Sequence, residues 1–169
     1  MTERGKRVLF ISPQPYFQWR GSPIRVGFNL LALSQLGYEV DLLTLPFGEE
    51  HPVPGVRVIR VRNLFGLKNI PIGPSPWKLL FDLRLWLAAR KLIRENPYDV
   101  IHAVEDAGTI AVPLSRMSRA RLVFEKHSDP GSYRRGLLRN LVMWGYGKAE
   151  AYSIRNADAV IGTGTGLVE

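Results

Sequence analysis

The 169-residue sequence contains no cysteine, which excludes a disulfide-bonded scaffold and a zinc site built from thiolates. No uncharged apolar run approaches the roughly 20 residues of a membrane-spanning helix. The short apolar run before Pro13 and Pro15 also falls short of the apolar region of about 7–15 residues that a signal peptide needs. We therefore expect a cytoplasmic protein, and leave open a peripheral position at the inner face of the membrane.

Two phosphate-binding motifs are incomplete. Gly131 and Gly136 have the GxxxxG spacing of a P-loop, but Leu137 and Leu138 stand where lysine and serine or threonine are required. The glycines of the segment 162–166 read GxGxG, and they do not follow the first strand as a dinucleotide-binding GxGxxG would. The sequence therefore favours neither a P-loop enzyme nor a dinucleotide-binding protein.

Other catalytic signatures are absent as well. No GxSxG is present, so a hydrolase with a nucleophile elbow has no support. The three histidines, His51, His102 and His127, show neither metal-ligand spacing nor a helical HExxH. We expect no metal site and no cofactor.

The composition is that of one globular domain, residues 1–169, because 46% of the residues are hydrophobic. The formal net charge of +8 favours anionic partners, namely phosphorylated substrates, an anionic membrane surface or nucleic acid. A basic surface without a specific partner accounts for the charge equally well.

Six apolar runs predict strands. Most of them are short and rich in valine, isoleucine and leucine without strict alternation, the pattern that burial on both faces of a parallel sheet produces. They are Arg7–Ser12, Glu39–Leu45, Val56–Val61, Asp99–Val104, Arg121–Lys126 and Ala159–Gly162. Four helices are predicted between them: Pro23–Leu36 with Ser22 as N-cap, Pro76–Glu95 with Ser75 as N-cap, Ala107–Ser118 and Leu137–Arg155. This order predicts a doubly wound α/β fold, with a mainly parallel Rossmann-like sheet, Val56–Val61 at its edge and helices on both faces.

Polar clusters follow four of the predicted strands. They are Gln18 to Ser22, Glu105 with Asp106, His127 to Asp129, and Thr163 to Thr165. Strand-end loops are polar in any such fold, but ligands of open α/β sheets bind at the carboxyl ends of the strands. The convergence of the clusters on one edge therefore predicts a site.

The loop at Gly21 has a physical rationale as an anion site. Glycine permits close approach of the backbone, and the helix that begins near Pro23 offers unpaired N–H groups and a positive dipole end. Arg20 and Arg25 favour a phosphate there, although a simple helix entry capped by Ser22 explains the same residues.

His127 follows an apolar strand and has Asp129 nearby, so it is a candidate for hydrogen bonding to a sugar or for proton transfer. A hydrogen bond to the backbone at the strand end is the alternative. His102 lies within a strand, and we expect it to pack in the core.

Five segments, in order, carry a family resemblance. They are RVLFISPQPYF with RGSP, LLALSQLGYEVDLLT, YDVIHAVED, FEKHSD and ADAVIGTGTGLVE. Together they resemble the amino-terminal domain of retaining glycosyltransferases of family four, which have the two-domain GT-B fold. The resemblance covers nearly the whole chain.

The resemblance implies a role for each candidate residue. Gly21, with Arg20 and Ser22 beside it, would lie close to the diphosphate of a nucleotide-sugar donor. His127 would contact the donor sugar or stabilise developing charge. The resemblance also implies that Glu105, Asp106 and Arg25 face the acceptor, a glycan or a lipid-linked molecule, and we count Asp129 among the substrate-binding candidates.

The family binds the nucleotide sugar mainly in a second domain, marked by two glutamates separated by seven residues. This chain contains no such pair. We therefore expect it to be the acceptor half, which shares the donor with a missing domain and has no turnover alone. The alternative is a non-catalytic α/β module that binds nucleotides or nucleic acid, although no nucleic-acid-binding motif is present.

The predicted helix Pro76–Glu95 has apolar residues on two sides, whereas packing on a sheet needs one. One side carries Leu79, Leu83, Trp86 and Leu87; the other carries Phe81, Leu85, Ala88 and Leu92. Basic residues accompany both. The excess apolar surface fits another helix, the missing domain or an anionic membrane surface.

Overall fold

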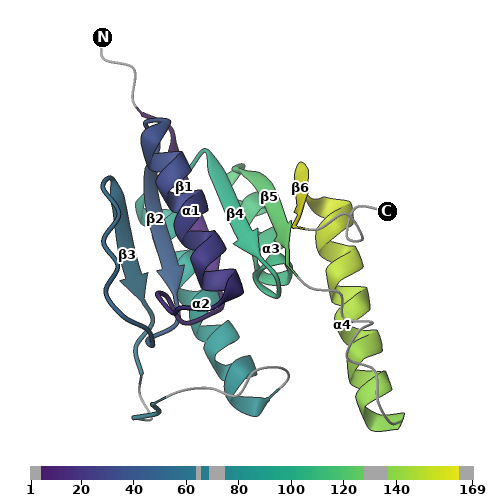
Figure 1. Cartoon of the computed structure of the whole chain (residues 1–169). Coiled ribbons are helices and arrows are strands. Elements are labelled where there is room, and N and C mark those ends of the chain that lie inside the picture. The colour runs from purple at the N-terminus through teal and green to yellow at the C-terminus, as the bar shows by residue number, and fades with distance from the viewer. Residues whose placement is uncertain (1–4, 64–65, 69–74, 128–136, 164–169) are drawn as a thin grey trace.

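The computed structural model describes residues 5–63, 66–68, 75–127 and 137–163. Within these ranges the chain forms one parallel six-stranded sheet in the order β3-β2-β1-β4-β5-β6 (Figure 1). The strands are β1 (Arg7–Ser12), β2 (Glu39–Thr44), β3 (Val56–Arg60), β4 (Val100–Val104), β5 (Arg121–Lys126) and β6 (Ala159–Gly162). The helices are α1 (Gly21–Gln35), α2 (Pro76–Glu95), α3 (Ala107–Ser118) and α4 (Leu137–Asn156).

The predicted fold class is confirmed, including the position of β3 at an edge of the sheet. Alternate residues of β1 show why its sequence is apolar throughout. Val8 and Phe10 pack on the face that α1 covers, whereas Leu9 and Ile11 pack on the face that α2 and α3 cover. Both faces of a central parallel strand are therefore buried, and no polar alternation remains.

The start of α1 differs from the prediction. The helix begins at Gly21 and its N-cap is Arg20, so the assignment of Ser22 as N-cap was wrong. The Ile24 amide donates to the Arg20 carbonyl at 3.1 Å, which places Pro23 inside the first turn. Proline fits there because the first-turn N–H groups have no partner within the helix.

The start of α2 is as predicted. The Ser75 hydroxyl accepts a hydrogen bond from the Lys78 amide at 3.1 Å, and Pro76 follows at the first helical position. No helix in the described part of the chain combines the length and the apolarity that crossing a membrane requires.

The loop after β1 is fixed to the segment that joins β2 and β3. Arg60 donates to the Tyr16 carbonyl at 2.8 Å and to the Glu49 carbonyl at 2.9 Å. Phe17 and Glu49 also exchange backbone hydrogen bonds of 3.0 and 2.8 Å. Gly48 lies at this contact with a φ of +105°, and a Cβ there would lie 2.4 Å from the Tyr16 carbonyl carbon. The approach of the two segments therefore requires glycine.

Replacing Gly48 with alanine (Gly48→Ala) should lower the free energy of unfolding by roughly 2–4 kcal/mol, because the backbone conformation is strained and the new methyl group meets backbone. Urea denaturation followed by circular dichroism measures the change. The matched control is Gly145→Ala, since Gly145 lies in α4 with nothing within 4 Å of its added Cβ. A loss of stability at Gly48 no larger than at Gly145 would contradict the packing described.

Candidate functional site

A buried carboxylate is the centre of the candidate site. Glu125 of β5 is 1% exposed. Its Oε2 accepts from His102 Nε2 at 2.9 Å, and its Oε1 accepts from His127 Nε2 at 2.8 Å. Asn29 Nδ2 lies 3.0 and 2.8 Å from the two carboxylate oxygens. We call Asn29, His102, Glu125 and His127 the Glu125 network.

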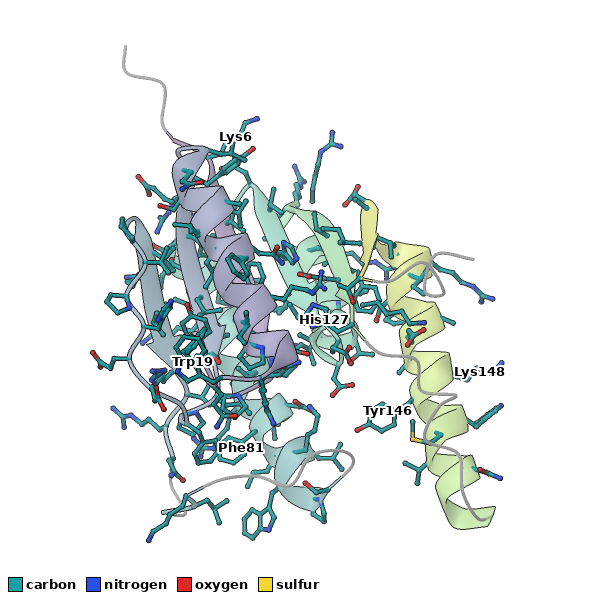
Figure 2. All side chains as sticks on the ribbon, viewed as in Figure 1. Lys6, Trp19, Phe81, His127, Tyr146 and Lys148 are labelled. Carbon is teal, nitrogen blue, oxygen red and sulfur yellow. The ribbon has the colours of Figure 1, made fainter. Side chains whose placement is uncertain are left out.

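The register of the sheet assembles this network. His102 of β4 pairs with Val123 of β5, two residues before Glu125, so His102 and Glu125 lie on the same face. On that face the Phe10 ring stacks on the His102 ring with 4.2 Å between centroids. Helix α1 covers the same face and supplies Asn29. His127 follows the end of β5 and lies beside α1 in Figure 2.

The network keeps Glu125 ionised. Burial alone would raise the pKa of its carboxyl group, but the hydrogen bonds and charges of His102 and His127 outweigh burial and lower the pKa from 4.5 to about 2. An ionised carboxylate only accepts hydrogen bonds, so both histidines carry a hydrogen on Nε2.

His127 has one ring nitrogen left for other chemistry. Its Nδ1 is buried and has no hydrogen-bond partner among the described residues. In the neutral ring this atom holds a lone pair that accepts a hydrogen bond or a proton, and in the protonated ring it donates. Glu125 holds the ring in place through Nε2, as the acidic residue of a catalytic triad orients its histidine.

Glu105 joins the ends of β4 and β5. Its Oε1 accepts from the backbone amide of His127 at 2.8 Å, and its own amide donates to the Glu125 carbonyl at 2.9 Å. Its φ is +53°, a left-handed conformation that is uncommon outside glycine. The structure therefore brings the predicted site residues Glu105 and His127 into direct contact.

Asp106 lies in a second cluster at the same edge. Its Oδ2 is 2.7 Å from Lys78 Nζ, which is also 3.1 Å from Asp82 Oδ1. Burial opposes a charge on Lys78, but Asp106 and Asp82 outweigh burial and raise its pKa. This cluster ties the first turn of α2 to the start of α3.

The remaining candidates lie at the start of α1. Arg20 makes no side-chain cap, and its Nε is buried without a partner among the described residues. A Cβ at Gly21 would meet nothing within 4 Å. Ser22 is partly buried and Arg25 is exposed. Asp129, together with Gly164 and Thr165 of the last polar cluster, lies outside the described residues.

Sequence reasoning did not identify Glu125, Asn29 or Lys78 as site residues. His102 packs in the core as expected, but it also binds Glu125. The usable signal was a glutamate directly after the apolar residues of β5, because a buried charge needs a partner. Among residues 5–63, 66–68, 75–127 and 137–163, no group of three or more histidine, cysteine, aspartate or glutamate residues could hold a metal ion.

The Glu125 network should make stability depend on pH. Because its pKa is lower in the folded state, Glu125 stabilises the fold fully above pH 4.5, and this contribution is lost as the pH falls towards about 2. The difference corresponds to roughly 3 kcal/mol. Glu125→Gln should remove this loss, so that its free energy of unfolding, measured in urea from pH 7 to acid, falls less steeply than that of the wild type.

The matched control for this experiment is Glu95→Gln, which removes an exposed carboxylate 3.7 Å from Lys91. This surface pair contributes little, so the control should follow the wild-type pH dependence. If the free energy of unfolding falls equally steeply with acid in Glu125→Gln and in the wild type, the network does not hold the carboxylate ionised.

Comparisons with known proteins agree with this architecture. The family model described as "Glycosyl transferase 4-like domain" matches residues 24–169. No curated protein sequence matches the chain. Sucrose-phosphate synthase from Thermosynechococcus elongatus has a similar structure, with a TM-score of 0.72 and 20% identity over 92% of this chain and 41% of that chain.

Two further solved structures share the fold. MurG from Acinetobacter baumannii gives a TM-score of 0.55 at 12% identity, over 96% of this chain and 42% of that chain. The catalytic domain of starch synthase IV from Arabidopsis thaliana, bound to ADP and acarbose, gives a TM-score of 0.57 at 14% identity, over 82% of this chain and 38% of that chain. The chain thus spans about two fifths of the length of all three. On the family match, and with this fold, the chain belongs to the glycosyl transferase 4-like domain family and is a glycosyltransferase domain of the GT-B type.

Proposed function

We propose that the chain is the amino-terminal, acceptor-side domain of a retaining glycosyltransferase of family four, which moves a sugar from a nucleotide-sugar donor to a glycan or lipid-linked acceptor. The observation that carries this proposal is the position of His127. It lies at the carboxyl edge of the sheet, with Nε2 held by Glu125 and Nδ1 without a partner among the described residues. Ligands of open α/β sheets bind at this edge.

In this proposal His127 acts on the donor. The transfer breaks the bond from the anomeric carbon to the diphosphate and joins that carbon to the acceptor oxygen. Negative charge then develops on the departing diphosphate and positive charge on the sugar. The Nδ1 of a neutral His127 would accept a hydrogen bond from a sugar hydroxyl, and a protonated ring would stabilise the diphosphate.

The start of α1 would hold the diphosphate. The first turn receives no side-chain cap from Arg20. Pro23 has no N–H group and the Ile24 amide donates to the Arg20 carbonyl, so the amides of Gly21 and Ser22 are the ones that an anion would use. Gly21 has a conformation and surroundings that would also accept alanine, so the fold alone does not explain the glycine there. A ligand that approaches the backbone closely would explain it.

The acceptor would bind on the other side of His127. Glu105 is fixed against the His127 amide, and Asp106 is fixed by Lys78, so both carboxylates have set positions at this edge. Arg25 is exposed on α1 and would meet the acceptor or the donor phosphates.

The donor nucleotide would be held by a second domain outside this chain. The lengths of the two chains support the proposal, since this chain covers only 41% of the sucrose-phosphate synthase chain. Half of a shared site binds the donor weakly, because the contacts of the other half are lacking. We therefore expect residues 1–169 alone to show no sugar transfer.

The test is sugar transfer from a panel of labelled nucleotide sugars, by the chain joined to the second domain of its gene and by residues 1–169 alone. The joined protein should transfer sugar, and His127→Gln should lower its kcat by about 100-fold or more. His51→Gln, which changes a histidine outside the Glu125 network, should leave kcat within about twofold of wild type.

Either of two results would contradict the proposal. One is transfer by residues 1–169 alone at a rate comparable to that of the joined protein. The other is an equal effect of His127→Gln and His51→Gln on kcat, because His127 would then have no special role in the reaction.

A further inference from the structure

Helix α2 carries an apolar stripe on its outer face. Leu79, Leu83 and Leu87 are 69%, 52% and 51% exposed, and their spacing of four residues aligns them along the helix. We call these three residues the leucine stripe. The opposite face of α2 is fully buried in the core through Phe81, Leu85 and Ala89. The sheet therefore does not account for the leucine stripe.

Basic side chains accompany the leucine stripe. Lys91 and Arg94 are exposed and continue it towards the end of the helix, and Arg84 and Arg90 lie partly buried beside it. Trp77 is 41% exposed in the first turn. Trp86, which the sequence pattern grouped with the leucines, is partly buried and packs against the core.

We propose that α2 docks the protein on an anionic membrane surface, with the leucine stripe in the lipid interface and the basic residues at the headgroups. An amphipathic helix with leucine or tryptophan on one face and lysine or arginine beside it binds membranes in this way. The net charge of +8 supplies long-range attraction to anionic lipids. An uncharged protein surface would cover the leucines but would offer no opposite charge to Arg84, Arg90 and Arg94, whereas Lys91 already lies 3.7 Å from Glu95.

Two other helices expose apolar residues. Helix α4 exposes Val142, Trp144, Tyr152 and Ile154 beside the basic Lys148 and Arg155. Lys148 lies between Trp144 and Tyr152 at the four-residue spacing, so these side chains form no unbroken apolar stripe. Helix α1 and its C-cap expose Phe28 and Leu36, at 66% and 74%, but Arg25 is the only basic residue of the helix. It also covers the opposite face of the sheet from α2, as Figure 1 shows, so both helices cannot lie on one flat surface together. The unbroken leucine stripe with basic residues beside it thus selects α2.

Docking through α2 would bring the candidate site close to the lipid. Lys78 in the first turn of α2 is 2.7 Å from Asp106, so the start of the helix lies at the carboxyl edge of the sheet. An acceptor anchored in the membrane would reach that edge without leaving its lipid. The docking itself requires no part of the proposed sugar transfer.

Cosedimentation with vesicles tests the docking. The vesicles contain phosphatidylcholine, with or without phosphatidylglycerol, and no nucleotide sugar is added. The wild type should bind the anionic vesicles at low salt, bind less at high salt, and bind the neutral vesicles weakly. Leu79→Ser with Leu83→Ser should lower partitioning into anionic vesicles by about tenfold or more. Circular dichroism checks the fold of each variant.

The matched control is Phe28→Ser with Leu36→Ser, which removes two exposed apolar side chains from α1 and should bind as the wild type does. A second variant, Lys91→Gln with Arg94→Gln, leaves the leucines in place and should reduce binding to anionic vesicles only. Absence of wild-type binding at low salt overturns the proposal, as does equal binding to neutral vesicles or equal loss in the α1 control. A dimer that the leucine variant dissociates, without vesicle binding, would instead assign the stripe to a second copy of the chain.

Discussion

The ionised carboxylate of Glu125, buried in the sheet, is the constraint on which the site depends. A buried charge is tolerated only when hydrogen bonds and opposite charge replace the lost water. Here two histidine rings and one amide do so, from β4, from the residue after β5 and from α1. Removing the carboxylate would therefore take away the shared partner of Asn29, His102 and His127, and with it the hydrogen bond that orients His127.

The carboxyl edge of the sheet is fixed on both sides of this network. On one side, Arg60 and the Phe17–Glu49 backbone pair hold the loop after β1, and Gly48 allows the close approach. On the other side, Lys78 joins α2 to Asp106. A parallel sheet brings these distant segments to one edge because all of its strands end there. Hydrogen bonds and an ion pair thus hold the described part of this edge, where the proposed substrates would bind.

Local patterns in the sequence predicted the fold well, and the site only in part. Apolar runs and the Ser75 cap marked β1, β5 and α2 at their observed bounds, because burial and capping act over a few residues. Ser22 misled the prediction of α1, since a proline tolerated in the first turn leaves the exact start open. The bond from Asn29 to Glu125 spans 96 residues and depends on how α1 lies on the sheet, which no local pattern specifies.

The central claim is that Glu125 holds His127 with its hydrogen on Nε2, which leaves Nδ1 for the proposed ligand. Nitrogen-15 NMR of the histidine rings tests it most directly, with His51 as an internal reference. The account predicts a hydrogen on Nε2 of His127 at neutral pH, and a change at its Nδ1, but not at His51, when a nucleotide sugar is added. A neutral His127 with its hydrogen on Nδ1 and a bare Nε2 would contradict the account.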